Sequence, residues 1–318
     1  MRLWQRSMIF LARHRSLNTF MQSRAAMSEL ATRFVGGHDV AEATATSLAL
    51  RSQGYRASLY CLGEYVEDLS VINRTVSELK AIAGKLAALK LDAHISVDPT
   101  QIGHGISEEI CRANARTVAQ EIKRVTSGAA ASSKNFLMLD MEDSAVTTAT
   151  ISLYETLRRE SLPAAVTLQA YLFRSEEDLK SIVQSGGAVR LVKGAFAESS
   201  AIAFTDRSEI DNNYLKLARL MLSDQARRTG FYPIFATHDA GLISEIVEVA
   251  THGGWKKEEY EFEMLLGVRR DLQQKLVQNG EQLRLYLPFG TDWWPYAVRR
   301  VGESPRNVKF LMRALVSG

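Results

Sequence analysis

Eight short apolar runs, each followed by an amphipathic stretch, constrain the fold of this chain more than any other feature of its sequence. The runs are rich in Val, Ile, Leu and aromatic residues, and they cover residues 57–63, 93–97, 135–142, 164–172, 188–196, 232–239, 259–267 and 283–288. Continuous apolar strands between amphipathic helices indicate a parallel sheet that is covered on its faces. Eight such units predict an α/β fold, a closed TIM-like (β/α)8 barrel.

The main alternative is an open, doubly wound sheet. That fold would place a glycine-rich dinucleotide-binding turn after the first strand. The chain reads Gly-Glu-Tyr-Val-Glu-Asp there, and the nearest match elsewhere, Gly103-His104-Gly105, lacks the third glycine. The sequence therefore favours the barrel.

Length and composition are those of an ordinary globular protein. The chain has 318 residues, of which 46% are hydrophobic and 24% are charged, so it can fill one large core. The net charge of +3 and the dispersed basic residues do not favour nucleic-acid binding. Two cysteines, Cys61 and Cys111, indicate no disulfide framework and fit a reducing cytoplasm. We expect an N-terminal helical segment over residues 1–54 and the barrel over residues 55–318.

Residues 1–27 form a basic stretch that is rich in Arg and has no acidic residue before Glu29. Such a stretch can be a targeting segment or a helix that lies on a membrane surface. Its apolar residues, among them Trp4 and Met8, resemble one stripe of a helix. We therefore favour an N-terminal helix that packs on the domain, and no apolar run is long enough to span a bilayer.

Polar residues gather where the predicted strands end, which is where barrels place their chemistry. In chain order they are Asp140, Glu142, Asp143, Gln169, Tyr171, Arg190, Lys193, Gly194, Thr237, His238, Asp239, Glu261, Glu263 and Tyr286. Some have a purely structural interpretation: Asp143 can cap the next helix, and Glu303 can pair on a surface with Arg299 or Arg300. Charges in a buried strand need partners, so Arg190 is the more informative residue.

The sequence does not favour metal or serine-hydrolase chemistry. We find no His-x-His in the first strand, no His-Glu-x-x-His and no nucleophile elbow, and we predict no metal. A Schiff-base lyase remains an alternative, because it needs one lysine on a barrel strand and Lys193 occupies such a place.

Taken in order, these segments resemble the proline dehydrogenase family, in particular its short monofunctional bacterial branch. The matching segments cover roughly residues 55–315 and read FLMLDMEDS, VTLQAYLFRSEEDL, RLVKGAF, ATHD, YEFEMLLGVRRDLQ and YLPFGTDWWPYAVRRVGESPRN. The resemblance implies a distorted (β/α)8 barrel with non-covalent FAD at its C-terminal face. It also implies oxidation of L-proline to 1-pyrroline-5-carboxylate, electron transfer to a quinone, and a cytoplasmic protein with peripheral contact to the inner membrane.

The resemblance assigns roles to residues of this chain. Asp140 and Arg190 match catalytic positions, and Arg190 would lie near flavin N5. Tyr286 would pack over the proline ring, Arg299 and Arg300 would hold the substrate carboxylate, and Glu303 would orient that pair. The remaining matches are cofactor contacts, namely Met141, Gln169, Lys193, Gly194, Ala195, Thr237, His238 and Glu263.

Two departures from the family pattern concern the same site. Asp98 stands where the family usually has a lysine that helps to hold the substrate carboxylate, and Glu263 stands where relatives often have glutamine. Either Asp98 is turned away or paired, with Arg299 or Arg300 as candidate partners, and the chain oxidises proline, or the substrate is a modified or different cyclic amine.

Overall fold

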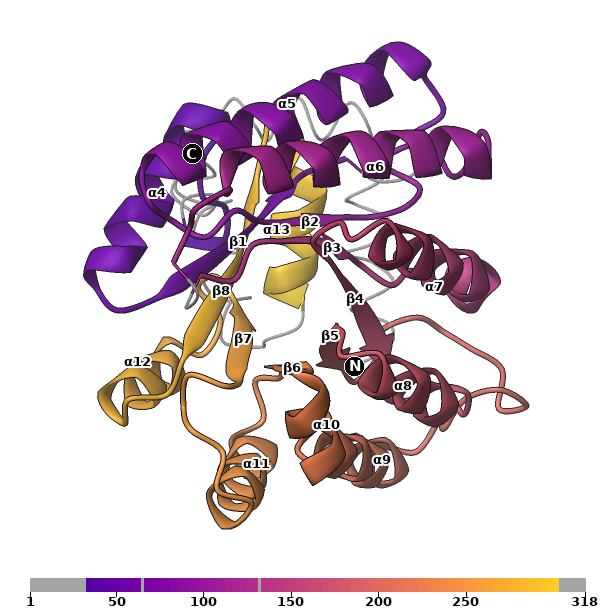
Figure 1. Cartoon of the computed structure of the whole chain (residues 1–318), viewed down its shortest axis with the longest axis vertical. Coiled ribbons are helices and arrows are strands. Elements are labelled where there is room, and N and C mark those ends of the chain that lie inside the picture. Colours follow the sequence, from indigo (N-terminus) through magenta and orange to yellow (C-terminus); the bar gives the residue numbers. More distant parts are fainter. Residues whose placement is uncertain (1–32, 64–65, 131–132, 303–318) are drawn as a thin grey trace, which may run out of the picture.

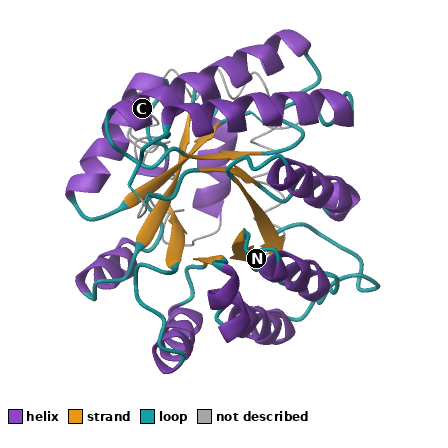
Figure 2. Cartoon of the chain, in the orientation of Figure 1, coloured by secondary structure: helices purple, strands orange, loops and turns teal. Residues whose placement is uncertain are grey.

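We analysed a computed structural model of the chain, which describes residues 33–63, 66–130 and 133–302. Its eight parallel strands close into a barrel in the order of the sequence, and β8 pairs with β1. All the described helices but the last surround the strands on the outside, and the last, at residues 293–302, is seen over the centre of the barrel (Figures 1 and 2). The predicted barrel is therefore confirmed. The basic stretch at residues 1–27 lies outside the described residues.

The strands match the predicted apolar runs closely. They are β1 (Arg56–Cys61), β2 (His94–Val97), β3 (Phe136–Leu139), β4 (Ala164–Gln169), β5 (Ala188–Val192), β6 (Tyr232–Ala236), β7 (Glu261–Leu265) and β8 (Leu283–Phe289). The helices are α4 (Val40–Ser52), α5 (Leu69–Ala88), α6 (Glu108–Val125), α7 (Ser144–Arg159), α8 (Ser175–Gln184), α9 (Arg207–Met221), α10 (Asp224–Thr229), α11 (Ala240–His252), α12 (Arg270–Gln278) and α13 (Trp293–Gly302).

One amphipathic stretch forms two helices. Residues 208–228, after the fifth apolar run, have the pattern of a single helix, but the chain forms α9 and α10 with a break at Leu222 and Ser223. The Ser223 side chain accepts a hydrogen bond from the backbone N–H of Ala226 and so caps α10. A serine that caps a new helix competes with continuation of the old one, and this explains the break.

Helix caps occupy the ends of several strand–helix connections. Asp143, for which we had considered a capping role, accepts a hydrogen bond from the backbone N–H of Ala145 at the start of α7. Asp239 caps α11 in the same way. An N-cap carboxylate satisfies free N–H groups and interacts favourably with the positive end of the helix dipole.

The core has two layers that differ in character. Outward-facing strand side chains such as Leu59, Ile95 and Phe262 are fully buried and pack against the surrounding helices. The burial of these apolar side chains is the main contribution to the stability of the barrel. Inside the barrel, by contrast, buried charged and polar side chains predominate on β1, β2, β7 and β8, where Ser58 and Arg284 are fully buried. The chemistry of the chain is therefore concentrated in the barrel interior.

None of the described helices is both long and apolar enough to cross a bilayer.

Candidate active site

Arg190 of β5 points into the barrel and is held there by partners from several strands. Its Nη1 donates to Asp140 Oδ1. Its Nε donates to Glu263 Oε2 at 3.0 Å, and its Nη2 lies 2.8 Å from Glu263 Oε1. Nη2 also donates to Ser96 Oγ at 2.8 Å and to Ser58 Oγ at 3.2 Å. A planar guanidinium engaged along both edges is fixed in position and orientation.

Two stacked tyrosines lie beside this arginine. Tyr286 of β8 donates from its Oη to Asp140 Oδ2 at 2.8 Å, and the Arg190 Cζ is 5.3 Å from the centre of its ring. Tyr60 of β1 stacks on Tyr286 with ring centres 5.4 Å apart and 30° between the planes. Tyr60 donates from its own Oη to Asp98 Oδ2 at 2.5 Å. The result is a continuous chain of contacts from Arg190 to Asp98.

The structure shows one hydrogen-bond partner of Asp98. We expected the carboxylate to be turned away or paired, with Arg299 or Arg300 as candidate partners. The Tyr60 hydroxyl donates to it, and this contact was not among our expectations. The side chain of Arg299 and the whole of Glu303 lie outside the described residues.

Burial shapes the protonation of the acidic residues around Arg190. Glu263 is 2% exposed, and burial raises its pKa to about 7, although the Arg190 charge acts in the opposite direction. Burial also raises the pKa of Asp140, against the influence of Arg190. Two carboxylates that share one arginine in a low-dielectric interior cannot both be ionised without cost. Glu263 can therefore exchange a proton near neutral pH.

Period-two alternation explains why these side chains converge. Successive strand residues point to opposite faces, so Ser58 and Tyr60 of β1 share the inner face with His94 and Ser96 of β2. These four residues were not among our candidates, because they precede the strand ends at which we expected the site. Alternating polar residues within otherwise apolar strands were the signal that could have identified them.

Below Arg190 lies a second buried charge network, the barrel floor. Arg284 is fully buried and donates to Glu261 Oε1 at 2.6 Å and to Asp92 Oδ2 at 2.9 Å. His94 is also fully buried, and its Nδ1 lies 2.9 Å from Ser58 Oγ. Burial, reinforced by the Arg284 charge, lowers the pKa of His94 well below its ordinary value. The imidazole is therefore neutral.

Among the described residues, His94, Glu261 and Glu263 are the one group whose donor atoms could surround a metal ion, since they lie within 4.8 Å of one another. Both carboxylates are already paired, Glu261 with Arg284 and Glu263 with Arg190. Two buried guanidinium charges at this distance oppose a divalent cation. The cluster is better suited to positioning Arg190 than to holding a metal.

Gln169 and Met141 lie together at the barrel mouth. The Gln169 side-chain amide donates to the backbone carbonyl of Glu142 at 3.2 Å and to that of Met141 at 3.4 Å. Its Oε1 is buried and has no hydrogen-bond partner among the residues that the structure describes. A buried acceptor of this kind calls for a donor from a ligand.

The turn after β5 carries three more of the predicted cofactor residues. Gly194 has φ +105°, and a Cβ at this position would lie 2.2 Å from the Tyr171 ring, so only glycine fits. Lys193 pairs through Nζ with Asp211 Oδ1 at 2.5 Å and with Asp239 Oδ2 at 3.1 Å. Ala195 is exposed.

Thr237 and His238 follow β6. Thr237 Oγ1 accepts a hydrogen bond from the backbone N–H of Asp239 at 3.1 Å. His238 Nε2 accepts one from the backbone N–H of Leu265 at 3.0 Å. Burial, with a contribution from the Arg300 charge, lowers the pKa of His238 to about 4. The imidazole is therefore neutral, and its Nδ1–H is available as a donor.

Arg300 of α13 belongs to the same face of the barrel. Its guanidinium carbon lies 5.1 Å from the centre of the Tyr296 ring. Its charge acts on His238, which places a cation near the carboxyl ends of β6 and β7.

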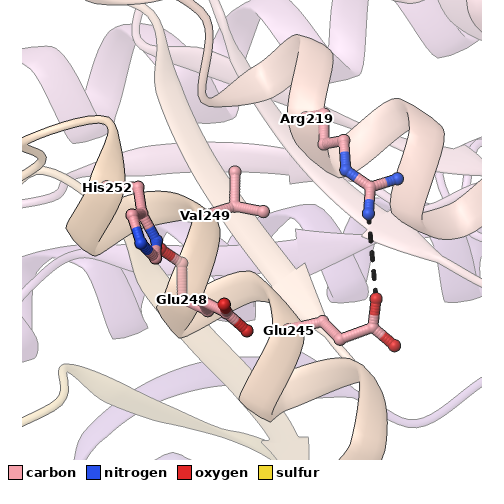
Figure 3. Close-up of a pocket in the computed structure, with 5 residues that line it drawn as sticks. All are labelled: Arg219, Glu245, Glu248, Val249 and His252. Atoms are coloured by element: carbon pink, nitrogen blue, oxygen red, sulfur yellow. Dashed lines mark hydrogen bonds and ion pairs between the residues drawn. The ribbon is translucent and has the colours of Figure 1, made fainter.

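A separate hollow lies on the outer surface between α9 and α11 (Figure 3). Arg219 faces Glu245 across it, with Arg219 Nη2 3.8 Å from Glu245 Oε2. Glu248, Val249 and His252 complete its lining. None of these five residues contacts the Arg190 cluster, so the hollow does not belong to the candidate site.

Comparison with known proteins agrees with this geometry. The family model described as proline dehydrogenase matches residues 43–313. Proline dehydrogenase 2 of Bacillus subtilis (strain 168) is 31% identical over 310 residues, which cover 96% of this chain and 97% of that protein. The proline dehydrogenase of Deinococcus radiodurans is 31% identical over 301 residues, which cover 93% of this chain and 93% of that protein.

Solved structures support the fold. Proline utilization A (PutA) from Bdellovibrio bacteriovorus, inactivated by N-propargylglycine, superposes with a TM-score of 0.76 at 23% identity over 86% of this chain. The chain spans about a third of the length of that protein, because the match covers 32% of it. Together with the full-length relatives and the family model, the barrel and its arginine cluster show that the chain is an oxidoreductase and a member of the proline dehydrogenase family.

Proposed function

We propose that this protein catalyses the FAD-dependent oxidation of L-proline to 1-pyrroline-5-carboxylate and passes the electrons to a quinone. The observation that carries the proposal is the fixed position of Arg190, which Asp140 and Glu263 hold beside the Tyr286 ring. A purely structural barrel has no need to converge these groups in its interior.

The residues at the barrel mouth fit an isoalloxazine ring. Gln169 Oε1 is a buried acceptor with no donor in the described part of the chain, and the ring offers an N–H group that suits it. Gly194 allows close approach of the backbone. The buried, neutral His238 offers an N–H donor without adding a charge. Bound FAD would supply the two-electron acceptor that the protein side chains cannot provide.

Each of the charged side chains around the site would have a separate role. Arg190, as a permanent cation, stabilises negative charge that develops beside it during the reaction. Asp140 holds both Arg190 and the Tyr286 hydroxyl, so one carboxylate fixes the charge and the wall of the substrate pocket together. Arg299 and Arg300 would bind the substrate carboxylate, and Glu303 would orient them.

An apolar rim supports a quinone as the electron acceptor. Phe173 (47% exposed) lies on the loop after β4, and Phe196 (38%) and Ile202 (41%) lie on the loop after β5. The backbone N–H of Phe173 donates to the carbonyl of Ile202 at 3.0 Å, which joins the two loops. Exposed apolar side chains beside a site suit an apolar partner or peripheral contact with a membrane surface.

A different cyclic amine is the second candidate substrate, and Asp98 is the observation that favours it. A carboxylate at this place does not attract a substrate carboxylate, and its hydrogen bond from the Tyr60 hydroxyl adds no positive charge. Turnover of proline, pyrrolidine and substituted pyrrolidines by the FAD-loaded protein, with a short-chain quinone as acceptor, tests the proposal. Proline-dependent quinone reduction supports it. Turnover restricted to amines without a carboxylate would favour the alternative.

The Schiff-base lyase is the least favoured alternative. A lysine that forms a Schiff base must be present as the neutral amine. The Lys193 Nζ is held by two carboxylates, Asp211 and Asp239, and a substrate carbonyl would have to displace both contacts to reach it. Borohydride treatment in the presence of substrate checks this directly: an adduct on Lys193 would support the lyase, and an unmodified Lys193 would exclude it.

A further inference from the structure

The pair formed by Tyr60 and Asp98 lies next to the predicted substrate wall but has no role in the proposed reaction so far. Tyr60 is 3% exposed and belongs to β1, whereas Asp98 directly follows β2. A hydrogen bond of 2.5 Å joins them. A buried tyrosine that donates to a carboxylate is held firmly, because a charged acceptor makes a stronger hydrogen bond than a neutral one.

Strand pairing explains why Tyr60 reaches Tyr286. In the parallel register of β1 and β8, Ser58 is the direct partner of Tyr286, and Tyr60 is the partner of Pro288. Tyr60 and Tyr286 are therefore diagonal neighbours on the inner face, a separation that aromatic side chains can bridge. Their rings stack with centres 5.4 Å apart, within the range of favourable aromatic pairs.

Tyr286 is consequently supported on three sides. Asp140 accepts from its hydroxyl, the Arg190 guanidinium lies over its ring, and the Tyr60 ring stacks against it. Asp140 and Arg190 are themselves fixed by their ion pair. Asp98 supplies the corresponding anchor for Tyr60.

We propose that Tyr60, anchored by Asp98, is a positioning residue that holds the Tyr286 ring in place and so sets the ring size of the substrate that the pocket accepts. The inference rests on the proposed function, in which Tyr286 packs over the ring of the substrate. It gives the acidic residue at position 98 a purpose, because its carboxylate secures the pocket wall and leaves the substrate carboxylate to the arginines of α13.

Substrate discrimination provides the test. The FAD-loaded wild type, Tyr60→Phe and Tyr60→Leu are assayed with proline and with pipecolate, whose ring has one more methylene. We expect Tyr60→Leu to lower the proline-to-pipecolate ratio of kcat/KM about tenfold, since one methylene is worth roughly 10–200-fold in a well-formed pocket. Most of the decrease in kcat/KM for proline should come from a higher KM. Tyr60→Phe, which keeps the ring, should show a smaller change in the same direction.

Tyr260→Phe is the matched control. Tyr260 is also buried (2% exposed) and also donates to a carboxylate, Glu281 Oε2, at 2.8 Å. It packs in the outer core with Phe235 and Phe262 rather than beside Tyr286. We expect Tyr260→Phe to lose about as much thermal stability as Tyr60→Phe and to keep the wild-type proline-to-pipecolate ratio of kcat/KM. An equal change of the ratio in Tyr260→Phe would show a general effect of destabilisation and would overturn the inference.

A second measurement does not depend on turnover. Melting temperatures of Tyr60→Leu, Tyr286→Leu and the double variant should be non-additive, with the double variant losing less than the sum of the two single losses. Additive losses, or an unchanged ratio in Tyr60→Leu, overturn the positioning role while leaving the proposed function intact. A wild type that oxidises neither amine refutes the proposed function itself, and this inference falls with it.

Discussion

Arg190 and Glu263 lie on β5 and β7, 73 residues apart in the chain, and meet inside the barrel through two contacts of 3.0 and 2.8 Å. The closed barrel is what brings them together, because their side chains point across its interior toward each other. Asp140 completes the arrangement from the end of β3. The proposed flavin-dependent oxidation depends mainly on this arginine and its two carboxylates.

Arg190→Lys keeps the positive charge but removes the planar fork that engages Asp140, Glu263 and the two serines. We expect kcat with proline to fall by about two orders of magnitude, which is the usual cost of losing one well-placed donor at a developing charge. Steady-state kinetics of the FAD-loaded variant measure this, with the melting temperature as a check on folding. A kcat within about threefold of wild type would contradict the central role of Arg190.

Glu263→Gln tests the protonation of the site. The pKa of Glu263 in the folded protein is raised to about 7, above the ordinary 4.5 of a glutamate. The folded state therefore holds this proton more tightly than the unfolded state. The resulting stability is fully present below pH 4.5 and is lost as the pH rises to about 7.

Relative to Glu263→Gln, which cannot titrate, wild type should lose roughly 3 kcal/mol of unfolding free energy across that window. The comparison with the variant is essential because His238 acts in the opposite direction. Its pKa is lowered to about 4, so its contribution increases between pH 4 and 6.5. Urea unfolding at several pH values measures the difference in unfolding free energy between the two proteins. A difference that does not change with pH would show that the pKa of Glu263 is not raised.

Asp98→Lys restores the residue that the family pattern has at this position. A lysine can donate to the Tyr60 hydroxyl, so the pair with Tyr60 is kept while the charge is reversed. We expect the KM for proline to fall about tenfold, equivalent to about 1.4 kcal/mol. Two unit charges ~4 Å apart at an effective dielectric near 20 interact by about 4 kcal/mol, so this change is well within reach. Asp98→Asn should give an intermediate KM, and an unchanged KM in both variants would show that the charge does not reach the substrate.

Arg284→Met tests the barrel floor apart from the reaction. The substitution removes the nearer guanidinium from the buried Glu261 and Asp92 and leaves them Arg56, whose Nη1 is 3.4 Å from Asp92 and 3.9 Å from Glu261. Breaking a buried ion pair from one side typically costs about 3–5 kcal/mol, and we expect a loss of unfolding free energy of that size. Denaturant unfolding measures it. If Arg284→Met is as stable as wild type, the floor network is not a stabilising element.

Much of the fold followed from the sequence, because eight apolar runs with amphipathic stretches between them leave few alternatives. The strand-end residues Asp140, Arg190 and Tyr286 contact one another inside the barrel, and their roles in the site stay predictions. The break between α9 and α10 was missed because a serine cap such as Ser223 is only a weak local signal inside a helical pattern.

The interior of the barrel was harder to predict. Ser58, Ser96 and Tyr60 lie within apolar strands, and nothing in a single strand shows that two neighbouring strands, β1 and β2, direct Ser58 and Ser96 at one arginine. Their significance depends on barrel register, which is a property of the whole sheet. The contact between Tyr60 and Asp98 was missed for the same reason: Tyr60 is 38 residues away in sequence but only one strand away in the barrel.

The most direct test is the visible spectrum of the purified, FAD-loaded protein before and after anaerobic addition of L-proline. We predict a yellow protein whose flavin absorbance is bleached by proline and restored by a quinone. A colourless preparation that takes up no added FAD, or a bound flavin that proline leaves oxidised, would contradict it.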